Sequence, residues 1–157
     1  MHLADLLTAD RVAVRRDDVG TALDKSKALH LLSELLARGT TIGADTIERV
    51  LREREALQST GIGEGVAIPH GAMLELDKQL AAVLTIPDGV DFDAIDGAKV
   101  NILFAVIGPK RASGEHLKTL ARVSRLLRSR GFRERLLGAP DGSDVFRMLL
   151  AEEEATR

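Results

Sequence analysis

Cysteine, tryptophan and tyrosine are missing from this 157-residue chain, and proline occurs only four times. Without cysteine there is no disulfide framework, no thiolate nucleophile and no cysteine-based metal site, which suits a reducing cytoplasm. Without tryptophan or tyrosine, the chain has few rings on which single-stranded bases can stack. The formal net charge of −2 also argues against general binding of polyanions. We therefore expect no nucleic-acid partner.

Long apolar runs are missing as well. No segment approaches the roughly 20 apolar residues that a membrane-spanning helix needs. The N-terminal sequence MHLADLLTAD contains acidic residues and no uninterrupted apolar stretch, so it does not read as a signal peptide. We expect a cytoplasmic protein that does not insert into a membrane.

The remaining composition is that of an ordinary globular protein, with 45% hydrophobic and 29% charged residues. A chain of this length forms one domain with a sizeable core. No repeat, low-complexity tract or linker divides it. We expect a single domain over residues 1–157, with its core at about 3–150 and a charged tail at 151–157.

Hydrophobic periodicity predicts alternating helices and strands. Helical spacing covers residues 24–38, 45–55, 115–130 and 144–154, with a short helix at 132–137. Strand-length apolar runs cover residues 12–14, 66–68, 80–86 and 100–107, and the last two end at prolines. Residues 60–65 read as a glycine loop. The runs around Ile68, Val83 and Phe104 are apolar on both faces. This pattern favours an α/β sandwich with a mostly parallel central sheet.

The segment GIGEGVAIPHG, residues 61–71, carries the strongest functional signal. Four glycines surround a histidine that directly follows a proline. Glycine permits close backbone approach, and proline fixes its own φ. We expect His70 at the exit of a short strand, on a rigid turn with little bulk beside it. A neutral imidazole is available there as a nucleophile at pH 7; the alternative is a structural or merely exposed histidine.

Two further residues have the chemistry to hold an anion. His116 lies at the start of a predicted helix, where free N–H groups favour an anion and disfavour a protonated imidazole. Arg54 falls on the apolar side of its helix, where a guanidinium needs a partner. A phosphoryl group would serve, because arginine offers forked donors. A solvent-exposed first-turn histidine and an arginine that reaches water remain open alternatives.

Other motifs are incomplete. GIGEGV is not a dinucleotide fingerprint, because Val66 stands where the third glycine belongs and no strand precedes it. There is no P-loop. The acidic segment from Asp91 to Gly97 lacks calcium-ligand residues at Ile95 and Ile102. We expect no nucleotide, metal or other cofactor. The arginine-rich run at residues 122–135 is a solvated face, a partner surface or, least favoured, a nucleic-acid surface.

The segment REALQSTGIGEGVAIPHG, residues 54–71, resembles the phosphorylation-site segment of mannitol/fructose-type EIIA proteins of the bacterial phosphotransferase system. The segments LADLLTADRVAV, DFDAIDGAKVNILFAVIGP and EHLKTLARVSRLL also fit that family. The resemblance covers about residues 3–150 and is closest to the nitrogen-regulatory EIIA branch. It implies a mixed sheet covered by helices on both sides. One departure is Glu64, where members of that branch often carry asparagine; it adds a negative charge near the expected phosphate site.

The resemblance also implies site roles. The phosphoryl acceptor would be a ring nitrogen of His70, with His116 and Arg54 binding the phosphoryl group. Thr60 and Ser59 are weaker candidates, because the Thr60 hydroxyl could bond the imidazole or phosphate, or cap the glycine loop. The donor would be a phosphorylated HPr-type protein, and the output would be regulation of other proteins. Alternatives are an EIIA component that passes phosphate to an EIIB domain of a sugar transporter, an EIIA-like module that is never phosphorylated, and a domain with incidental histidines.

Overall fold

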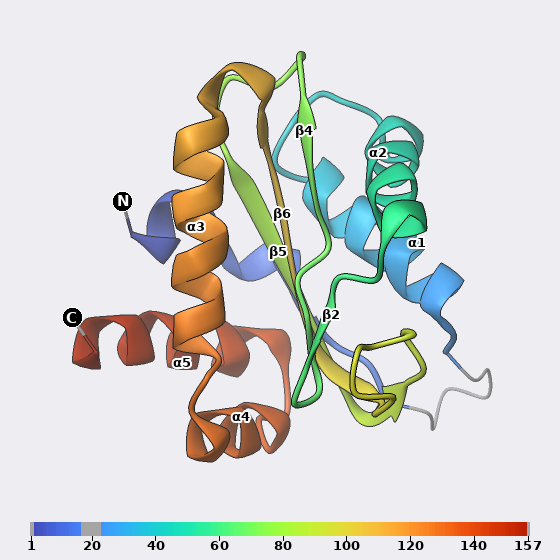
Figure 1. Cartoon of the computed structure of the whole chain (residues 1–157). Helices are drawn as coiled ribbons and strands as arrows, with labels where there is room; N and C mark the ends of the chain where they lie inside the picture. The colour runs from blue at the N-terminus through green and yellow to red at the C-terminus, as the bar shows by residue number, and fades with distance from the viewer. Residues whose placement is uncertain (1, 17–22, 157) are drawn as a thin grey trace.

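A mixed β-sheet lies between two layers of helices in the computed structural model, which describes residues 2–16 and 23–156 (Figure 1). The strands are β1 (Val12–Val14), β2 (Gly61–Gly63), β3 (Val66–Ala67), β4 (His70–Met73), β5 (Leu80–Val90) and β6 (Val100–Pro109). The α-helices are α1 (Lys25–Ala37), α2 (Ala44–Leu57), α3 (Ser113–Leu126), α4 (Arg130–Leu137) and α5 (Gly142–Ala155). Short 3₁₀ helices are η1 (Leu3–Asp5), η2 (Ala9–Arg11) and η4 (Lys110–Ala112).

The long strands β5 and β6 form the centre of the sheet. The described strands run in the order β1-β5-β6-β3-β2, and β4 continues along the same edge of β6 as β3. The pairs β1–β5, β3–β6 and β4–β6 are parallel, whereas β5–β6 and β2–β3 are antiparallel. The predicted α/β class with a mixed sheet is confirmed, although its longest pairing is antiparallel.

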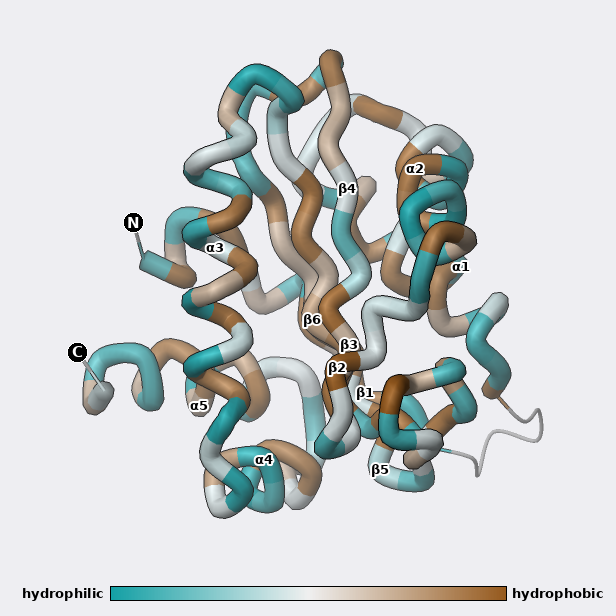
Figure 2. Tube along the Cα trace, in the orientation of Figure 1, coloured by the Kyte–Doolittle hydropathy of each residue, from teal (hydrophilic) through white to brown (hydrophobic). Residues whose placement is uncertain are grey.

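Side chains alternate between two cores along the central strands. On β6, Leu103, Ala105 and Ile107 pack toward α1 and α2. Their neighbours Ile102, Phe104 and Val106 pack toward η1, α3, α4 and α5. This period of two follows from strand geometry, and it explains why the run is apolar throughout. Apolar, brown segments of β3 and β6 accordingly lie between the two helical layers (Figure 2).

Local capping fixes where the helices begin. Asp24 precedes α1 and its side chain accepts a hydrogen bond from the backbone of Lys27. Asp141 does the same for α5, and Ser129 for α4. These side chains satisfy N–H groups that a helix leaves unpaired at its first turn. Among the described residues, no helix is both long and apolar enough to cross a membrane.

Three predictions of local structure are wrong. The helix expected at residues 115–130 ends at Leu126, and α4 begins at Arg130. The expected glycine loop at residues 60–65 is a β-hairpin, in which Glu64 and Gly65 turn the chain with φ values of 60° and 79°. Such two-residue turns require positive φ at both positions. Strand β5 also continues through Pro87 to Val90. Its pairing with β6 is interrupted between Thr85 and Val90, so Pro87 lies where a missing N–H breaks no ladder hydrogen bond.

Candidate functional site

His70 is the first residue of β4, and its position is fixed by the sheet. It pairs with Val106 of β6, whose backbone N–H donates to the carbonyl of Pro69 at 2.9 Å. The sequence prediction placed His70 on a turn at the exit of a strand. The break after β3 covers only Ile68 and Pro69, so His70 instead opens a further strand along the same edge of β6. The imidazole is therefore carried on a sheet strand rather than on a free loop.

Hydrogen bonds to the His70 ring select one neutral tautomer. Nδ1 lies 2.7 Å from the carbonyl oxygen of Ile68, an atom that can only accept, so Nδ1 carries the proton. Nε2 then has a free lone pair. The Nε–H group of Arg54 donates to this nitrogen at 3.3 Å. Both contacts are satisfied by the same tautomer, in which Nε2 carries the ring lone pair.

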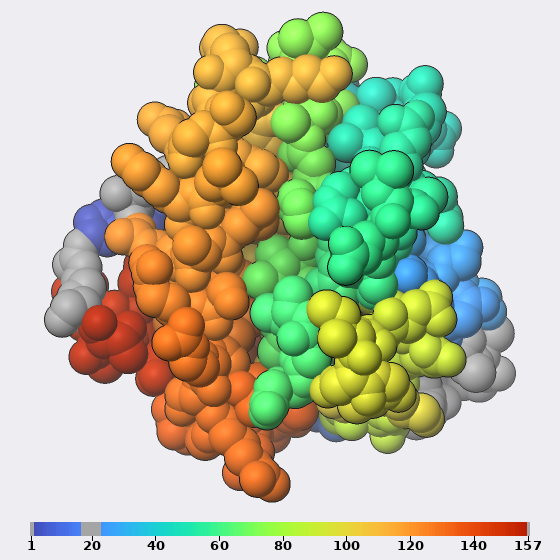
Figure 3. Space-filling view, in the orientation of Figure 1, coloured from blue at the N-terminus to red at the C-terminus, as the bar shows by residue number. Residues whose placement is uncertain are grey.

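Arg54 reaches His70 from the last turn of α2. Its Nη1 donates to the carbonyl of Gln58 at 2.9 Å, which satisfies one of the carbonyls beyond the helix end. Its Nε points to Nε2 of His70. The guanidinium is half-buried, as is the imidazole. The segment of β4 lies in a hollow between α2 and α3 (Figure 3).

His116 approaches the same imidazole from the opposite helix. It lies in the first turn of α3, and its ring centroid is 5.8 Å from that of His70. The side chain is 8% exposed, yet neither ring nitrogen has a hydrogen-bond partner. Gly108 of β6 leaves the space, because a Cβ there would lie 3.1 Å from Nδ1 of His116. A buried imidazole without a partner is costly, which indicates a group awaiting a ligand.

Burial keeps both histidines neutral. It lowers the pKa of His70 below its ordinary value, and the charge of Arg54 lowers that pKa further, while the Ile68 carbonyl and Glu55 act in the opposite direction. Burial also lowers the pKa of His116, with a smaller contribution from His70. A neutral imidazole retains the lone pair that nucleophilic attack requires. The site therefore holds two neutral imidazoles beside a permanent cation.

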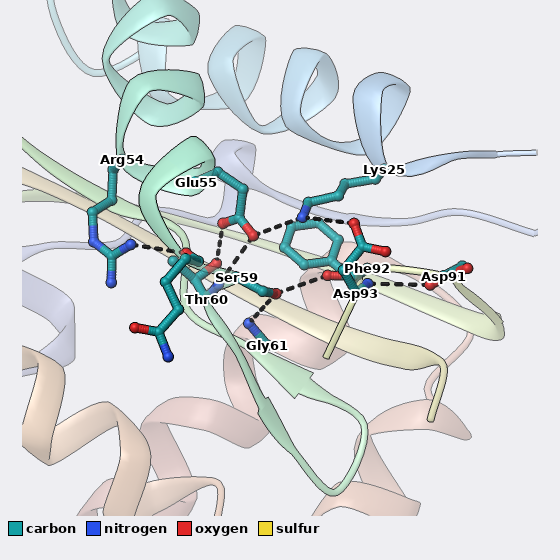
Figure 4. A network of polar contacts seen from close by, with 10 residues as sticks. Lys25, Arg54, Glu55, Ser59, Thr60, Gly61, Asp91, Phe92 and Asp93 are labelled. Atoms are coloured by element: carbon teal, nitrogen blue, oxygen red, sulfur yellow. Dashed lines mark hydrogen bonds and ion pairs between the residues drawn. The ribbon is translucent and has the colours of Figure 1, made fainter. Parts of the chain in front are cut away.

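Ser59 and Thr60 do not touch His70 with their hydroxyl groups. The Thr60 hydroxyl donates to Oε1 of Glu55 at 2.6 Å, and the backbone N–H of Thr60 donates to Oε2 at 3.0 Å. The Ser59 hydroxyl donates to the carbonyl of Phe92 at 2.8 Å and accepts from the N–H of Gly61 (Figure 4). Both hydroxyls thus hold the chain between α2 and β2. The structure brings together His70, His116 and Arg54, and leaves these two residues to support the segment beside them.

Glu64 is directed to a different part of the molecule from the one expected. Its carboxylate lies 2.9 Å from Nη2 of Arg133 on α4. Arg133 is buried, and its Nη1 also donates to the carbonyls of Leu127 and Arg128. The charge of Glu64 is therefore paired, and it ties the β2–β3 hairpin to the junction between α3 and α4.

The basic run at residues 122–135 does not form one continuous face. Arg133 is buried, and Arg122 and Arg135 approach carboxylates of α5 at 3.8 and 3.3 Å. In the acidic segment, carboxylate oxygens of Asp91 and Asp96 accept backbone N–H groups nearby. These residues are engaged in the fold, and no cluster of three or more metal-ligating residues occurs in the described part of the chain.

Comparison with known proteins shows the family of this chain. The family description "Phosphoenolpyruvate-dependent sugar phosphotransferase system, EIIA 2" matches residues 7–152. The chain belongs to this EIIA family.

Individual EIIA relatives match most of this chain in sequence, and a solved structure shares its fold. A nitrogen regulatory protein of Pseudomonas aeruginosa is 37% identical over 127 residues, covering 80% of this chain and 82% of the relative. A fructose-specific EIIA component of Haloferax volcanii is 33% identical over 122 residues, covering 77% and 79%. The crystal structure of the nitrogen regulatory protein IIA-Ntr of Neisseria meningitidis superposes with a TM-score of 0.83 at 30% identity, covering 94% and 98%. These similarities support a phosphocarrier role in the phosphotransferase system.

One residue at the site of this EIIA protein was not predicted from the sequence. Glu55 is 7% exposed, although it carries a charge. A signal was present, because Glu55 continues the buried helical stripe formed by Ile47 and Leu51 at four-residue spacing. The same apolar spacing led to the prediction of Arg54, but Glu55 was not singled out. A carboxylate at a buried position indicates partners held elsewhere in the fold.

Proposed function

We propose that this EIIA protein accepts a phosphoryl group on Nε2 of His70 from a phosphorylated HPr-type protein and regulates other proteins through its phosphorylation state. The observation that carries this proposal is the pair of contacts on the His70 ring. Ile68 holds the proton on Nδ1, and the Nε–H of Arg54 donates at 3.3 Å to the lone pair of Nε2. This is the arrangement that a phosphoryl acceptor needs: one nitrogen free to attack and one cation next to the incoming charge.

The transfer step is a simple exchange of bonds. The lone pair of Nε2 attacks phosphorus, the bond from phosphorus to the donor's histidine nitrogen breaks, and its electron pair returns to the donor. The Nδ1 proton stays on the bond to Ile68, so the positive charge that develops on the ring is held against a carbonyl oxygen. Arg54 donates to the phosphoryl oxygens. His116 supplies a second N–H, because either of its ring nitrogens is free to take part.

A protein donor is supported by the surroundings of the site. Leu57 lies at the end of α2, three residues after Arg54, and is 82% exposed. Leu117 follows His116 on α3 and is 67% exposed. Large apolar side chains on a surface commonly mark contacts with another macromolecule. Each lies close in sequence to a site residue, so a protein that docks at the site could cover both.

Regulation would follow from charge. A phosphoryl group adds about −1.5 to −2 charges at pH 7. Placed beside exposed apolar side chains, that charge is costly to bury without a partner, so a protein that docks over unmodified His70 would be released. The nitrogen-regulatory relatives and the IIA-Ntr structure support a regulatory output over sugar transport.

The experiment is phosphoryl transfer in a defined mixture. The protein is incubated with phosphoenolpyruvate, Enzyme I and an HPr-type carrier, and intact mass is measured before and after acid treatment. We expect one acid-labile phosphoryl group on the wild type and none on His70→Ala. Loss of modification in wild type when the carrier is omitted identifies the carrier as donor. A His70→Ala protein that is phosphorylated at the wild-type rate would refute the proposal.

A sugar-transport role is the second candidate, favoured by the 33% identity to a fructose-specific EIIA component. In that case the phosphoryl group would move from His70 to an EIIB domain. The two functions differ in the acceptor. Mixing the purified phospho-protein with fructose- and mannitol-type EIIB domains and following loss of the label separates them, because a regulator retains its phosphoryl group in their presence.

A further inference from the structure

Glu55 connects three separate parts of the chain behind the phosphoryl site (Figure 4). Its Oε1 accepts from the Thr60 hydroxyl, and its Oε2 accepts from the Thr60 backbone N–H. Nζ of Lys25, at the start of α1, lies 2.9 Å from Oε2. These three donors account for the burial of the carboxylate, because a buried charge is tolerated only when it is paired and hydrogen-bonded. Glu55 is thus an anchor between α1, α2 and the strand that follows.

Lys25 extends the anchor to the loop before β6. Its Nζ also lies 3.3 Å from the carboxylate of Asp93 and 4.7 Å from the ring centroid of Phe92. The carbonyl of Phe92 in turn accepts the hydroxyl of Ser59. The chain that leaves α2 is therefore held on both sides, by Glu55 and by the Phe92 segment.

From Thr60 the hydrogen bonds continue to the reactive imidazole. The backbone carbonyl of Thr60 accepts the N–H of Ile68 at 3.0 Å. The carbonyl of Ile68 accepts the Nδ1–H of His70 at 2.7 Å. Glu55 therefore fixes Thr60, Thr60 fixes Ile68, and Ile68 sets the His70 tautomer. Each link acts by position, because the N–H and C=O of one residue belong to different peptide units.

We propose that Glu55 is a positioning residue that holds Thr60 and Ile68 so that His70 keeps its proton on Nδ1 and presents Nε2 beside Arg54. Arg54 and Glu55 are neighbours at the end of α2, and they act on different sides of the imidazole. Arg54 faces Nε2 directly, whereas Glu55 secures the opposite, Nδ1 side of the ring through the backbone.

The electrostatics act in the same direction. Arg54 of α2 and His116 of α3 face His70 directly, and Glu55 of α2 acts on it through its charge. The charge of Glu55 raises the pKa of His70, against the lowering by burial and by Arg54. A more basic imidazole is a stronger nucleophile, provided that it stays neutral at the working pH. Glu55 therefore supports Nε2 both by geometry and by charge.

The test compares Glu55→Gln with Glu53→Gln, an exposed carboxylate of the same helix. Long-range ¹H–¹⁵N spectra of the unmodified protein report the tautomer and the pKa of His70. We expect Glu55→Gln to lower that pKa and to populate the Nε2–H tautomer, with Glu53→Gln unchanged. Glutamine has one acceptor oxygen instead of two and no charge, so it cannot accept from both the N–H and the hydroxyl of Thr60, and it no longer pairs with Lys25 as an ion. A folded Glu55→Gln protein with the wild-type tautomer and pKa would overturn the proposal.

A milder variant keeps the proposal testable if Glu55→Gln fails to fold. Thr60→Val removes only the hydroxyl link to Glu55, and Thr60→Ser restores it. We expect the Nδ1–H tautomer to weaken in the valine variant and to recover in the serine variant. An unchanged tautomer in Thr60→Val would contradict the chain of contacts.

The rate of phosphorylation is a second readout, and only this part rests on the proposed function. Loss of one hydrogen bond corresponds to a factor of up to about ten, so we expect Glu55→Gln to accept phosphate up to about tenfold more slowly than Glu53→Gln. Failure of the proposed function would leave every variant unmodified while the His70 spectra still differ. Failure of the positioning role would leave both rate and spectra equal to those of the wild type.

Discussion

Replacing Arg54 by methionine removes a permanent cation that contacts Nε2 of His70. Methionine keeps the length and the helix propensity of the side chain, so the end of α2 should persist. Two consequences follow from the same loss of charge. The phosphoryl group loses a charged donor, and the pKa of His70 rises, because Arg54 lowers it in the wild type.

The size of the rate effect follows from the geometry. In the unmodified protein Nη1 of Arg54 donates to the carbonyl of Gln58 and Nε donates to Nε2 of His70, so Nη2 is left for a phosphoryl oxygen. A hydrogen bond to a charged group contributes about 1.5–3 kcal/mol. At about 1.4 kcal/mol per factor of ten, one such bond corresponds to a rate loss of about 10- to 150-fold. Arg54 is half-buried, so solvent weakens the bond and we expect a loss near the lower end, about tenfold.

The assay is the initial rate of phosphorylation by a phosphorylated HPr-type carrier, at a carrier concentration well below saturation. Arg49→Met is the matched control, because Arg49 is an exposed arginine of the same helix. Arg54→Lys should fall between the wild type and Arg54→Met, since lysine keeps the charge but not the fork of donors. An Arg54→Met protein with a wild-type rate and an unchanged His70 pKa would refute the assignment of Arg54 to the site.

Three further predictions concern the fold around the site. Gly71→Ala should destabilise the protein by about 1–3 kcal/mol in denaturant unfolding, because the new Cβ would lie 2.5 Å from Cγ1 of Val50. Gly114→Ala is the control, since its Cβ would meet nothing within 4 Å. Adding Val50→Ala to Gly71→Ala should relieve the clash. Phosphorylation of His70 should raise the pKa of His116, since a dianion favours the imidazolium, and an unchanged value in NMR titration would place the phosphoryl group away from His116. Acid should destabilise the fold, because the pKa values of His70 and His116 are lowered in the folded state. Below the unfolded histidine pKa of about 6.5, the unfolded chain therefore binds more protons than the folded protein. The free energy of unfolding should fall as the pH drops through that value. His30 has a raised pKa in the folded state, so it opposes this loss of stability in acid. A His116→Gln variant should lose less stability in acid than the wild type, and an equally steep loss would contradict the contribution assigned to His116.

The helices and the central strands were predictable because their signals are local. The stripe of leucines in α1 and the apolar run of β6 each reflect burial against a whole layer. The end of β5 was predicted wrongly at Pro87. A proline is tolerated inside this strand because the pairing of β5 with β6 is irregular there. The side chain of Asn101 donates to the carbonyls of Ile86 and Pro87 at that irregularity, a contact between strands that no local pattern reveals.

The site was predictable in part, for the same reason. Arg54 and His70 carry signals in their own segments, and the resemblance to EIIA proteins joined them to His116. Glu55 escaped because a buried carboxylate depends on partners from other elements, here Lys25 and Thr60. Glu64 was expected beside the phosphate site, but its position at the hairpin turn brings it to Arg133 of α4. Pairings between distant segments decide both cases.

The most direct test of the account is to identify the ring nitrogen that carries the phosphoryl group. The ¹⁵N-labelled protein is phosphorylated through the carrier, and long-range ¹H–¹⁵N spectra with ³¹P detection assign the modified atom. The hydrogen bond from Nδ1 to the carbonyl of Ile68 predicts phosphorylation at Nε2 of His70, with the proton retained on Nδ1. A phosphoryl group on Nδ1, or on any residue other than His70, would contradict the account.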